Sequence, residues 1–190
     1  KLSEKHNSLV IYDEIQCGLS RTGSVLYSDQ LPLKADVVTL AKALGGGVPI
    51  GACITKGRAN EILVPGDHGS TYGGNPFVCS VALTVLNEIT TPEFLAHVNK
   101  MSDYACKKIA ELQAKHPEIE EIRGQGLLLG FKLDDKISAG DFVKKALENK
   151  LLLVAAGGNV VRYFPALIVT EKEIDATMPI LDTVLTQLKA

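Results

Sequence analysis

Apolar and polar positions follow two different patterns in the two halves of the chain. In the first half, short apolar runs over residues 8–15, 36–40 and 51–55 are interrupted by charged residues and glycines. Nearly continuous apolar runs of this length indicate strands buried on both faces, as in a parallel sheet covered by helices. From residue 77 the apolar residues recur at helical spacing, which predicts a helix over 77–88.

The second half predicts another architecture. Thr90-Thr91-Pro92 ends the first helix, and a new helical period begins at Glu93. The pattern then predicts strands at 119–123 and 127–133, a helix at 141–149, strands at 151–154 and 160–164, and a closing helix at 171–188. The order αββαββα is typical of a small α+β unit with helices on one face of a sheet. We therefore expect an α/β chain of two domains, residues 1–92 with a mostly parallel sheet and residues 93–190.

Composition excludes several classes of function. The chain has 190 residues and a formal net charge of −2, and its basic residues form no cluster, so a nucleic-acid partner has no electrostatic support. The longest apolar stretches are far shorter than the roughly 20 residues of a membrane helix, so no membrane partner is expected. Four widely separated cysteines suggest free thiols and a cytoplasmic setting, and no metal-ligand spacing is present. The chain also lacks an initiating methionine, and we expect it to begin inside a longer protein.

Lys42 is the first candidate catalytic residue. It lies in LAKALGGGVPIG, residues 40–51, between apolar neighbours and three glycines. Most lysines are solvated surface charges. Here the apolar neighbours predict a partly buried amine, which is more nucleophilic near neutral pH because burial disfavours the ammonium form. The glycines would let the backbone approach a ligand closely.

Asp13 and Glu14 end the first predicted strand. They could be solvated strand-end carboxylates or an acid–base pair such as a glycosidase uses. Since neighbours in a strand face opposite sides, we expect Asp13 and Ile15 to share a face and Glu14 to point away. An aspartate beside an apolar side chain suits a flat heteroaromatic ring with a basic nitrogen.

The remaining candidates concern anions. The glycines of residues 45–47 and of residues 124–130 match neither nucleotide-binding glycine motif. The loop HGSTYGGN, residues 68–75, offers hydroxyls and flexible amides that suit a phosphate, although an ordinary polar loop has the same composition. Arg162 interrupts an apolar strand, and a buried arginine needs an anion such as a carboxylate.

Five segments in order resemble the class III pyridoxal-phosphate-dependent aminotransferases. They are YDEIQCGLSRTG at 12–23, LAKALGGGVPIGA at 40–52, HGSTYGGNP at 68–76, EIRGQGLLLGF at 121–131 and AAGGNVVRYFPAL at 155–167. The resemblance covers essentially the whole chain, and the AGGNVVR stretch resembles the acetylornithine aminotransferases of that family most. It implies the carboxyl-terminal portion of such a chain, with residues 1–92 in the large cofactor domain and 93–190 as the small domain.

The resemblance also implies roles for single residues. Lys42 would bind the aldehyde of pyridoxal 5'-phosphate and later move a proton, and Asp13 would keep the pyridine nitrogen protonated. Gln16 would hydrogen-bond the phenolic oxygen, and Ile15 would pack on the ring. The hydroxyls of Ser70 and Thr71 would bind the phosphate across a homodimer interface. Arg162 would bind a substrate carboxylate, such as that of 2-oxoglutarate.

The activity so implied is transfer of an amino group from N-acetylornithine, or a related ω-amino donor, to 2-oxoglutarate in arginine biosynthesis. Cys17 and Ala166 depart from the usual family residues without touching this chemistry. Three alternatives stay open: a non-catalytic fragment, a related aminomutase, and an ornithine aminotransferase.

Overall fold

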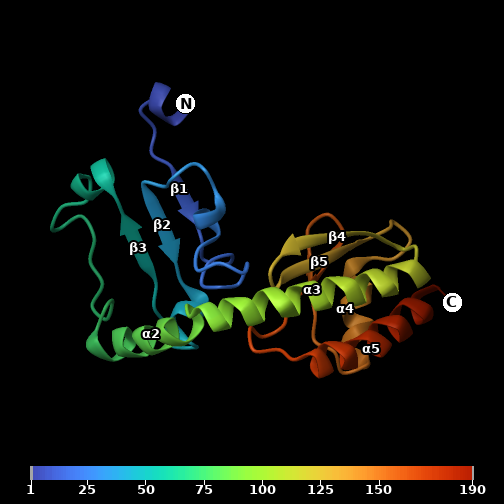
Figure 1. Cartoon of the computed structure of the whole chain (residues 1–190). Helices are drawn as coiled ribbons and strands as arrows, with labels where there is room; N and C mark the ends of the chain where they lie inside the picture. Colours follow the sequence, from blue (N-terminus) through green and yellow to red (C-terminus); the bar gives the residue numbers. More distant parts are fainter. Residues whose placement is uncertain (1, 190) are drawn as a thin grey trace. The chain divides into compact units, whose positions relative to one another are not determined.

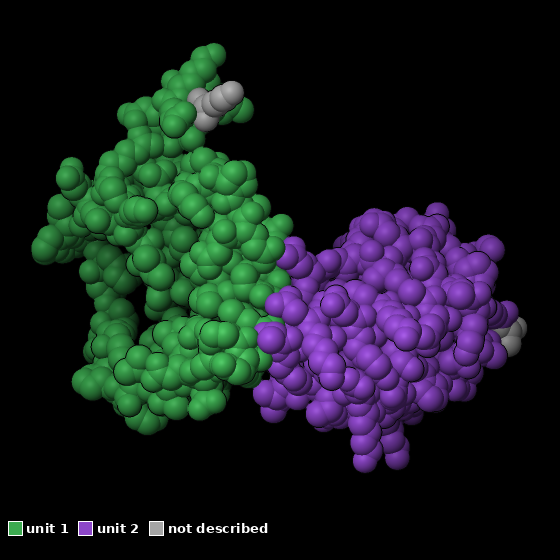
Figure 2. Space-filling view, viewed as in Figure 1, with its two compact units in different colours: residues 1–95 green, residues 96–190 purple. Residues whose placement is uncertain are grey.

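The computed structural model describes residues 2–189. The chain divides into two compact units, residues 1–95 and residues 96–190 (Figure 2). The division predicted after residue 92 falls at the start of helix α3 (Pro92–Lys115), which begins in the first unit and runs into the second. Each unit has its own sheet.

The sheet of the first unit has the order β1-β2-β3, with β1 at Ile11–Asp13, β2 at Val37–Leu40 and β3 at Ala52–Thr55 (Figure 1). Strand β1 pairs with β2 in parallel, whereas β2 pairs with β3 in antiparallel. The sheet predicted as mostly parallel is therefore mixed. The connection 41–51 is shorter than the dozen or so residues that a parallel crossover requires.

Helix α2 (Pro76–Ile89) covers the carboxyl end of β2. Asn75 caps it, its side-chain oxygen accepting a hydrogen bond of 3.2 Å from the Val78 amide. The helix packs on the short helix η2 (Lys42–Gly45). The buried cluster beneath it consists of Leu19, Leu40, Leu44, Ala82 and Ile89. The other short helices of this unit are α1 (Leu2–Lys5), η1 (Tyr27–Gln30) and η3 (Gly57–Glu61).

The second unit is an antiparallel sheet with helices α4 (Ala139–Glu148) and α5 (Glu171–Lys189) beside it (Figure 1). Its strands are β4 (Ile119–Gln125), β5 (Leu128–Leu133), β6 (Val154–Ala156) and β7 (Val160–Tyr163), in the order β4-β5-β7-β6. The element order is the predicted αββαββα, but β6 begins later than expected. Lys150 has a positive φ of 64°, and the Leu151 amide donates to Ala146 at the end of α4 instead of joining the sheet.

Asn159 fixes the turn between β6 and β7 and ties it to the β5–α4 connection. Its backbone is left-handed, with φ 58°, a conformation that asparagine tolerates better than most residues. Its side-chain amide donates to the carbonyls of Leu133, Asp134 and Ile137, at 3.1, 2.8 and 2.9 Å, and its oxygen accepts from the Ala139 amide at 2.7 Å. The asparagine of the AGGNVVR stretch therefore has a structural function in this unit.

Two further observations concern residues 2–189 as a whole. None of their helices combines the length and apolar content needed to cross a membrane. No group of three or more histidine, cysteine, aspartate or glutamate side chains among them is placed to hold a metal ion.

Candidate functional site

Asp13 is the last residue of β1, and only one oxygen of its carboxylate accepts hydrogen bonds from the described residues. Its Oδ1 accepts hydrogen bonds from the Ile15 amide at 3.1 Å and from the Thr39 hydroxyl at 3.3 Å. Its Oδ2 has no hydrogen-bond partner among the described residues, and the side chain is exposed. The carboxylate is thus oriented by its own chain and still has an oxygen free to accept a hydrogen bond.

The relation of Asp13 to Ile15 differs from the predicted one. Strand β1 ends at Asp13, so the two residues are linked by a side-chain turn and not by strand alternation. Glu14 does point elsewhere, as predicted. It is only 2% exposed and accepts hydrogen bonds from the Tyr27 and Ser28 amides at 2.8 and 2.6 Å. Two adjacent carboxylates therefore have separate environments.

Lys42 lies at the same edge of the sheet as Asp13. Because β1 and β2 are parallel, Asp13 is the register partner of Thr39, and Lys42 follows Thr39 by three residues. The amine of Lys42 forms no hydrogen bond or ion pair with a described residue. Lys42 has a left-handed φ of 48°, which costs a non-glycine residue roughly 1–2 kcal/mol. Strain of this kind persists where surrounding structure enforces it and often accompanies function.

The predicted burial of the Lys42 amine is wrong for the described chain, in which the side chain is exposed. Its apolar neighbours Leu40 and Leu44, 7% and 5% exposed, belong to the core cluster under α2. They pack inward and do not form a collar around the amine.

The glycines after Lys42 serve the packing of the chain itself. A Cβ on Gly46, where φ is +55°, would lie 2.9 Å from a methyl group of Val85 in α2. A Cβ on Gly45 would lie 2.9 Å from a methyl group of Ile50. Only at Gly47, with φ +108°, is the space open within 4 Å. Of the three, Gly47 alone fits the expectation of a backbone left open to a ligand.

A hollow of about 400 Å³ adjoins this edge. It is lined by Pro49, Ile50, Gly51, His68, Ser70, Tyr72, Gly73 and Gly74. A Cβ on Gly51 would lie 3.5 Å from the carbonyl oxygen of Leu40, which places the hollow next to the end of β2. The hydroxyl oxygen of Ser70 accepts from the Gly73 amide at 3.0 Å, which leaves its proton available to a ligand. Thr71 is exposed and does not line the hollow.

Arg162 belongs to the second unit. It lies in β7 between Gly130 of β5 and Val154 of β6, and its side chain is half-buried. No described residue gives the guanidinium a hydrogen bond or an ion pair. The structure therefore brings Asp13, Ile15, Gln16 and Lys42 to one sheet edge with Ser70 in the adjoining hollow, and Arg162 stands in the other unit.

The loop 14–28 contains features that the sequence reasoning missed. Burial lowers the pKa of the Arg21 guanidinium to about 10. Burial and the neighbouring Glu14 carboxylate raise the pKa of the Cys17 thiol to about 11. The alternation of side chains along a strand indicated that Glu14 points away from Asp13. No pattern in the sequence predicts that the Glu14 carboxylate is buried against the amides of Tyr27 and Ser28.

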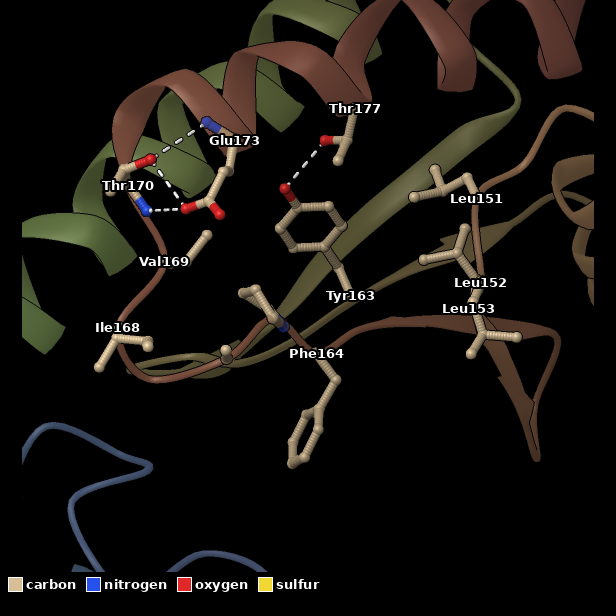
Figure 3. A pocket seen from close by; sticks show the side chains of 12 residues that line it. Leu151, Leu152, Leu153, Tyr163, Phe164, Ile168, Val169, Thr170, Glu173 and Thr177 are labelled. Atoms are coloured by element: carbon tan, nitrogen blue, oxygen red, sulfur yellow. Dashed lines mark hydrogen bonds between the residues drawn. The ribbon is translucent and has the colours of Figure 1, made fainter.

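A second hollow, of about 430 Å³, lies in the second unit and is mostly apolar (Figure 3). Glu173 is its one carboxylate, and that group is already engaged. Its Oε2 accepts from the amide and the hydroxyl of Thr170, each at 2.8 Å, and the Thr170 hydroxyl oxygen accepts from the Glu173 amide. These hydrogen bonds hold the pKa of Glu173 below its ordinary value and form a capping box at the start of α5. None of the candidate site residues from the sequence lines this hollow.

Comparison with known proteins gives the family. Residues 1–185 match the family model described as aminotransferase class-III. The chain belongs to this family. Over 189 residues it is 43% identical to a protein of Caldanaerobacter subterraneus subsp. tengcongensis named acetylornithine aminotransferase, covering 100% of this chain and 48% of the relative.

Solved structures give the same result. A crystal structure of N-acetylornithine aminotransferase from Stenotrophomonas maltophilia matches with a TM-score of 0.88 and 33% identity, covering 98% of this chain and 49% of that one. A structure of Plasmodium falciparum ornithine delta-aminotransferase matches with a TM-score of 0.88 and 31% identity, covering 98% and 48%. The chain spans about half the length of the relatives it matches, and its position within their longer chains stays a prediction.

Proposed function

We propose that the protein is a pyridoxal-phosphate-dependent aminotransferase that moves an amino group from N-acetylornithine, or a related ω-amino donor, to 2-oxoglutarate, giving glutamate. One observation carries the proposal. The free Oδ2 of Asp13 and the unpaired amine of Lys42 lie at one edge of the β1–β2 sheet. Crevices beyond the carboxyl ends of parallel strands are the usual ligand sites of α/β sheets.

The residues at this edge fit the cofactor in chemical type. Pyridoxal phosphate has a basic ring nitrogen, an aldehyde, a phenolic oxygen and a phosphate. The Asp13 carboxylate supplies an acceptor for the protonated ring nitrogen, and the Lys42 amine supplies a nucleophile for the aldehyde. When bound, the cofactor supplies an electron sink for the carbanion formed at the substrate carbon that bears the reacting amino group.

The neighbouring side chains suit the remaining groups of the ring. Gln16 is exposed beside Asp13, and its amide is free to donate to the phenolic oxygen. Ile15 is half-buried and offers an apolar face to the ring. The Lys42 amine, once free, would take a proton from the substrate carbon that bears the reacting amino group and would return it, acting first as a general base and then as a general acid.

The hydroxyls of Ser70 and Thr71 are proposed to bind the phosphate. Ser70 lies in the hollow beside the sheet edge, where the Gly73 amide donates to its oxygen and leaves the hydroxyl proton for the phosphate. Thr71 is exposed outside the hollow, which suits contact with the site of a second subunit in a homodimer.

Arg162 is proposed to bind a substrate carboxylate, since its guanidinium lacks an anionic partner in the described chain and its planar fork matches a carboxylate. The names of the relatives favour N-acetylornithine as the donor, and a place in arginine biosynthesis in the cytoplasm accords with that substrate. The equal structural likeness to an ornithine aminotransferase favours ornithine as the second candidate. Assays of the protein with both donors and 2-oxoglutarate distinguish them.

Reductive labelling tests the cofactor site. We expect pyridoxal phosphate and borohydride to modify Lys42, as located by peptide mapping. Lys42→Ala should abolish this label, whereas Lys56→Ala, at an exposed lysine after β3, should leave it unchanged. Label scattered over surface lysines with Lys42 unmodified would contradict the proposal and favour a non-catalytic fragment.

A further inference from the structure

Glu14 occupies an unusual position in the first unit. The largest fully buried side chains of the described residues all lie in the second unit except Glu14, and all are apolar except Glu14. The residue stands between Asp13 and Ile15, the two residues proposed to contact the ring. A carboxylate is thus the most completely buried large side chain of the unit that contains the proposed site.

The contacts of Glu14 join three parts of that unit. Its side chain accepts from the amides of Tyr27 and Ser28, at the far end of the loop 14–28. The backbone amide of Glu14 donates to the Thr39 carbonyl at 3.0 Å. Glu14 thereby extends the β1–β2 hydrogen bonding by one residue beyond the last register pair, Asp13 and Thr39. Thr39 in turn donates its hydroxyl to Asp13. The carboxylate therefore closes the loop on the strand ends that carry Asp13 and Lys42.

The burial of Glu14 is energetically unfavourable by itself. No lysine or arginine of residues 2–189 forms an ion pair with it, so backbone amides and the Cys17 thiol at 3.5 Å are the groups that compensate its desolvation. Burying a charge without a countercharge opposes folding unless hydrogen bonds compensate it. The same hydrogen bonds also fix the backbone on either side of Glu14 relative to the loop amides.

The loop closed by Glu14 is also strained. Leu19 and Ser20 have successive left-handed φ values of 55° and 67°. A Cβ on Gly18 would lie 2.9 Å from the carbonyl oxygen of Glu14 and 3.0 Å from its Oε2, so the loop packs directly on the carboxylate. Strained conformations persist only where the surrounding contacts determine them.

We propose that Glu14 is a positioning residue, which fixes the direction of the segment Asp13–Gln16 by binding the Tyr27 and Ser28 amides. The inference rests on the proposed function, because that segment is taken to face the cofactor. Glu14 itself does not touch the cofactor. It acts by holding Asp13 Oδ2, Ile15 and Gln16 in one orientation before the cofactor binds.

Three variants test this proposal. Glu14→Gln removes the charge and one acceptor, because its amide group cannot accept from a backbone N–H. Gly18→Ala keeps Glu14 but displaces it through the new Cβ. Ser102→Ala is the matched control, since it removes another buried side-chain hydrogen bond, that of 2.7 Å to the Gly126 carbonyl in the second unit.

Two measurements are made on each variant. The first is the pyridoxal phosphate concentration that half-saturates borohydride labelling of Lys42, and we expect it to rise at least about tenfold in Glu14→Gln, less in Gly18→Ala, and not in Ser102→Ala. The second is the pH midpoint of Cys17 alkylation in cofactor-free protein. It should fall in Glu14→Gln from about 11 toward the ordinary thiol value of 9.0, because the neighbouring charge is lost while burial remains.

The outcomes separate the two proposals. If Lys42 is not labelled in the unaltered protein, the proposed function fails and the positioning role fails with it. If Lys42 is labelled but Glu14→Gln binds pyridoxal phosphate like the unaltered protein, Glu14 is merely structural and the inference is overturned. If Glu14→Gln unfolds, Gly18→Ala decides, since unchanged half-saturation in a folded Gly18→Ala overturns the inference as well.

Discussion

The two units differ in how their interiors are built. In the second unit many apolar side chains are completely buried, among them Phe131, Phe142 and Leu185, each 0% exposed. In the first unit no apolar side chain reaches that burial, and its most buried apolar residue is Leu19 at 2%. The first unit also exposes large apolar side chains, including Ile62, Leu63 and Val64 at 56, 59 and 56%.

The difference follows from what each unit contains. A four-stranded antiparallel sheet with helices packed beside it fills its own core, whereas a three-stranded sheet with long loops leaves apolar surface uncovered. Most of the proposed site lies in the less filled unit, at the end of β1, shortly after β2 and in the loop before α2. The region proposed to carry the chemistry is therefore held by hydrogen bonds and backbone conformation more than by a dense core.

The first prediction tests the difference in core packing. Phe142→Ala should destabilise the second unit by about 4 kcal/mol, because Phe142 is fully buried and packs edge-on against Phe131 with ring centroids 5.5 Å apart. Leu44→Ala in the first unit should cost only about 2 kcal/mol, at the low end for such truncations, because its surroundings are more open.

Denaturant titrations monitored by alkylation of single cysteines measure both effects. Cys106 reports on the second unit and Cys17 on the first, and both are half-buried. Equal destabilisation by Phe142→Ala and Leu44→Ala would show that the two interiors do not differ in the way described.

The second prediction concerns glycine packing at the proposed site. Gly46→Ala should destabilise the first unit by about 3 kcal/mol, because it combines the strain of a left-handed residue with a Cβ at 2.9 Å from Val85. Gly57→Ala is the matched control. It has a similar φ of +59° and open space within 4 Å, so only the conformational cost of about 1 kcal/mol is expected.

Denaturant unfolding of both variants measures the difference. A cost that is the same at the two positions would mean that η2 does not pack on α2 as tightly as described. The glycines after Lys42 would then be explained by backbone conformation alone.

Local patterns predicted the elements well and their interactions poorly. The spacing of apolar residues predicted α2, α4 and α5 within a few residues, since the apolar face of a helix is visible as a period in the sequence itself. The antiparallel direction of β3 follows from the short connection that precedes it, and the late start of β6 follows from the positive φ at Lys150. The apolar pattern predicted neither of these two features.

The same distinction applies to the proposed site. The family resemblance implied that Asp13 and Lys42 act on one cofactor, and the parallel β1–β2 register puts both at a common sheet edge. The apolar residues around Lys42 gave a wrong expectation of burial, because Leu40 and Leu44 pack under α2. The environment of Glu14 depends on amides thirteen and fourteen residues away, which no local pattern specifies.

The smallest predicted effect concerns a polar contact in the densely packed unit. His116, the residue after α3, forms a hydrogen bond of 2.6 Å with Asp182 of α5, and this contact holds the pKa of Asp182 below its ordinary value of 3.8. A lowered folded-state pKa stabilises the fold above the unfolded value and loses that contribution as pH falls through the folded value. Asp182→Asn should therefore flatten the loss of stability of the second unit below pH 3.8, relative to the unaltered protein, in unfolding titrations at stepwise lower pH. The exposed Asp135→Asn should leave the slope unchanged, and identical slopes for all three proteins would mean that the contact between His116 and Asp182 does not stabilise the second unit.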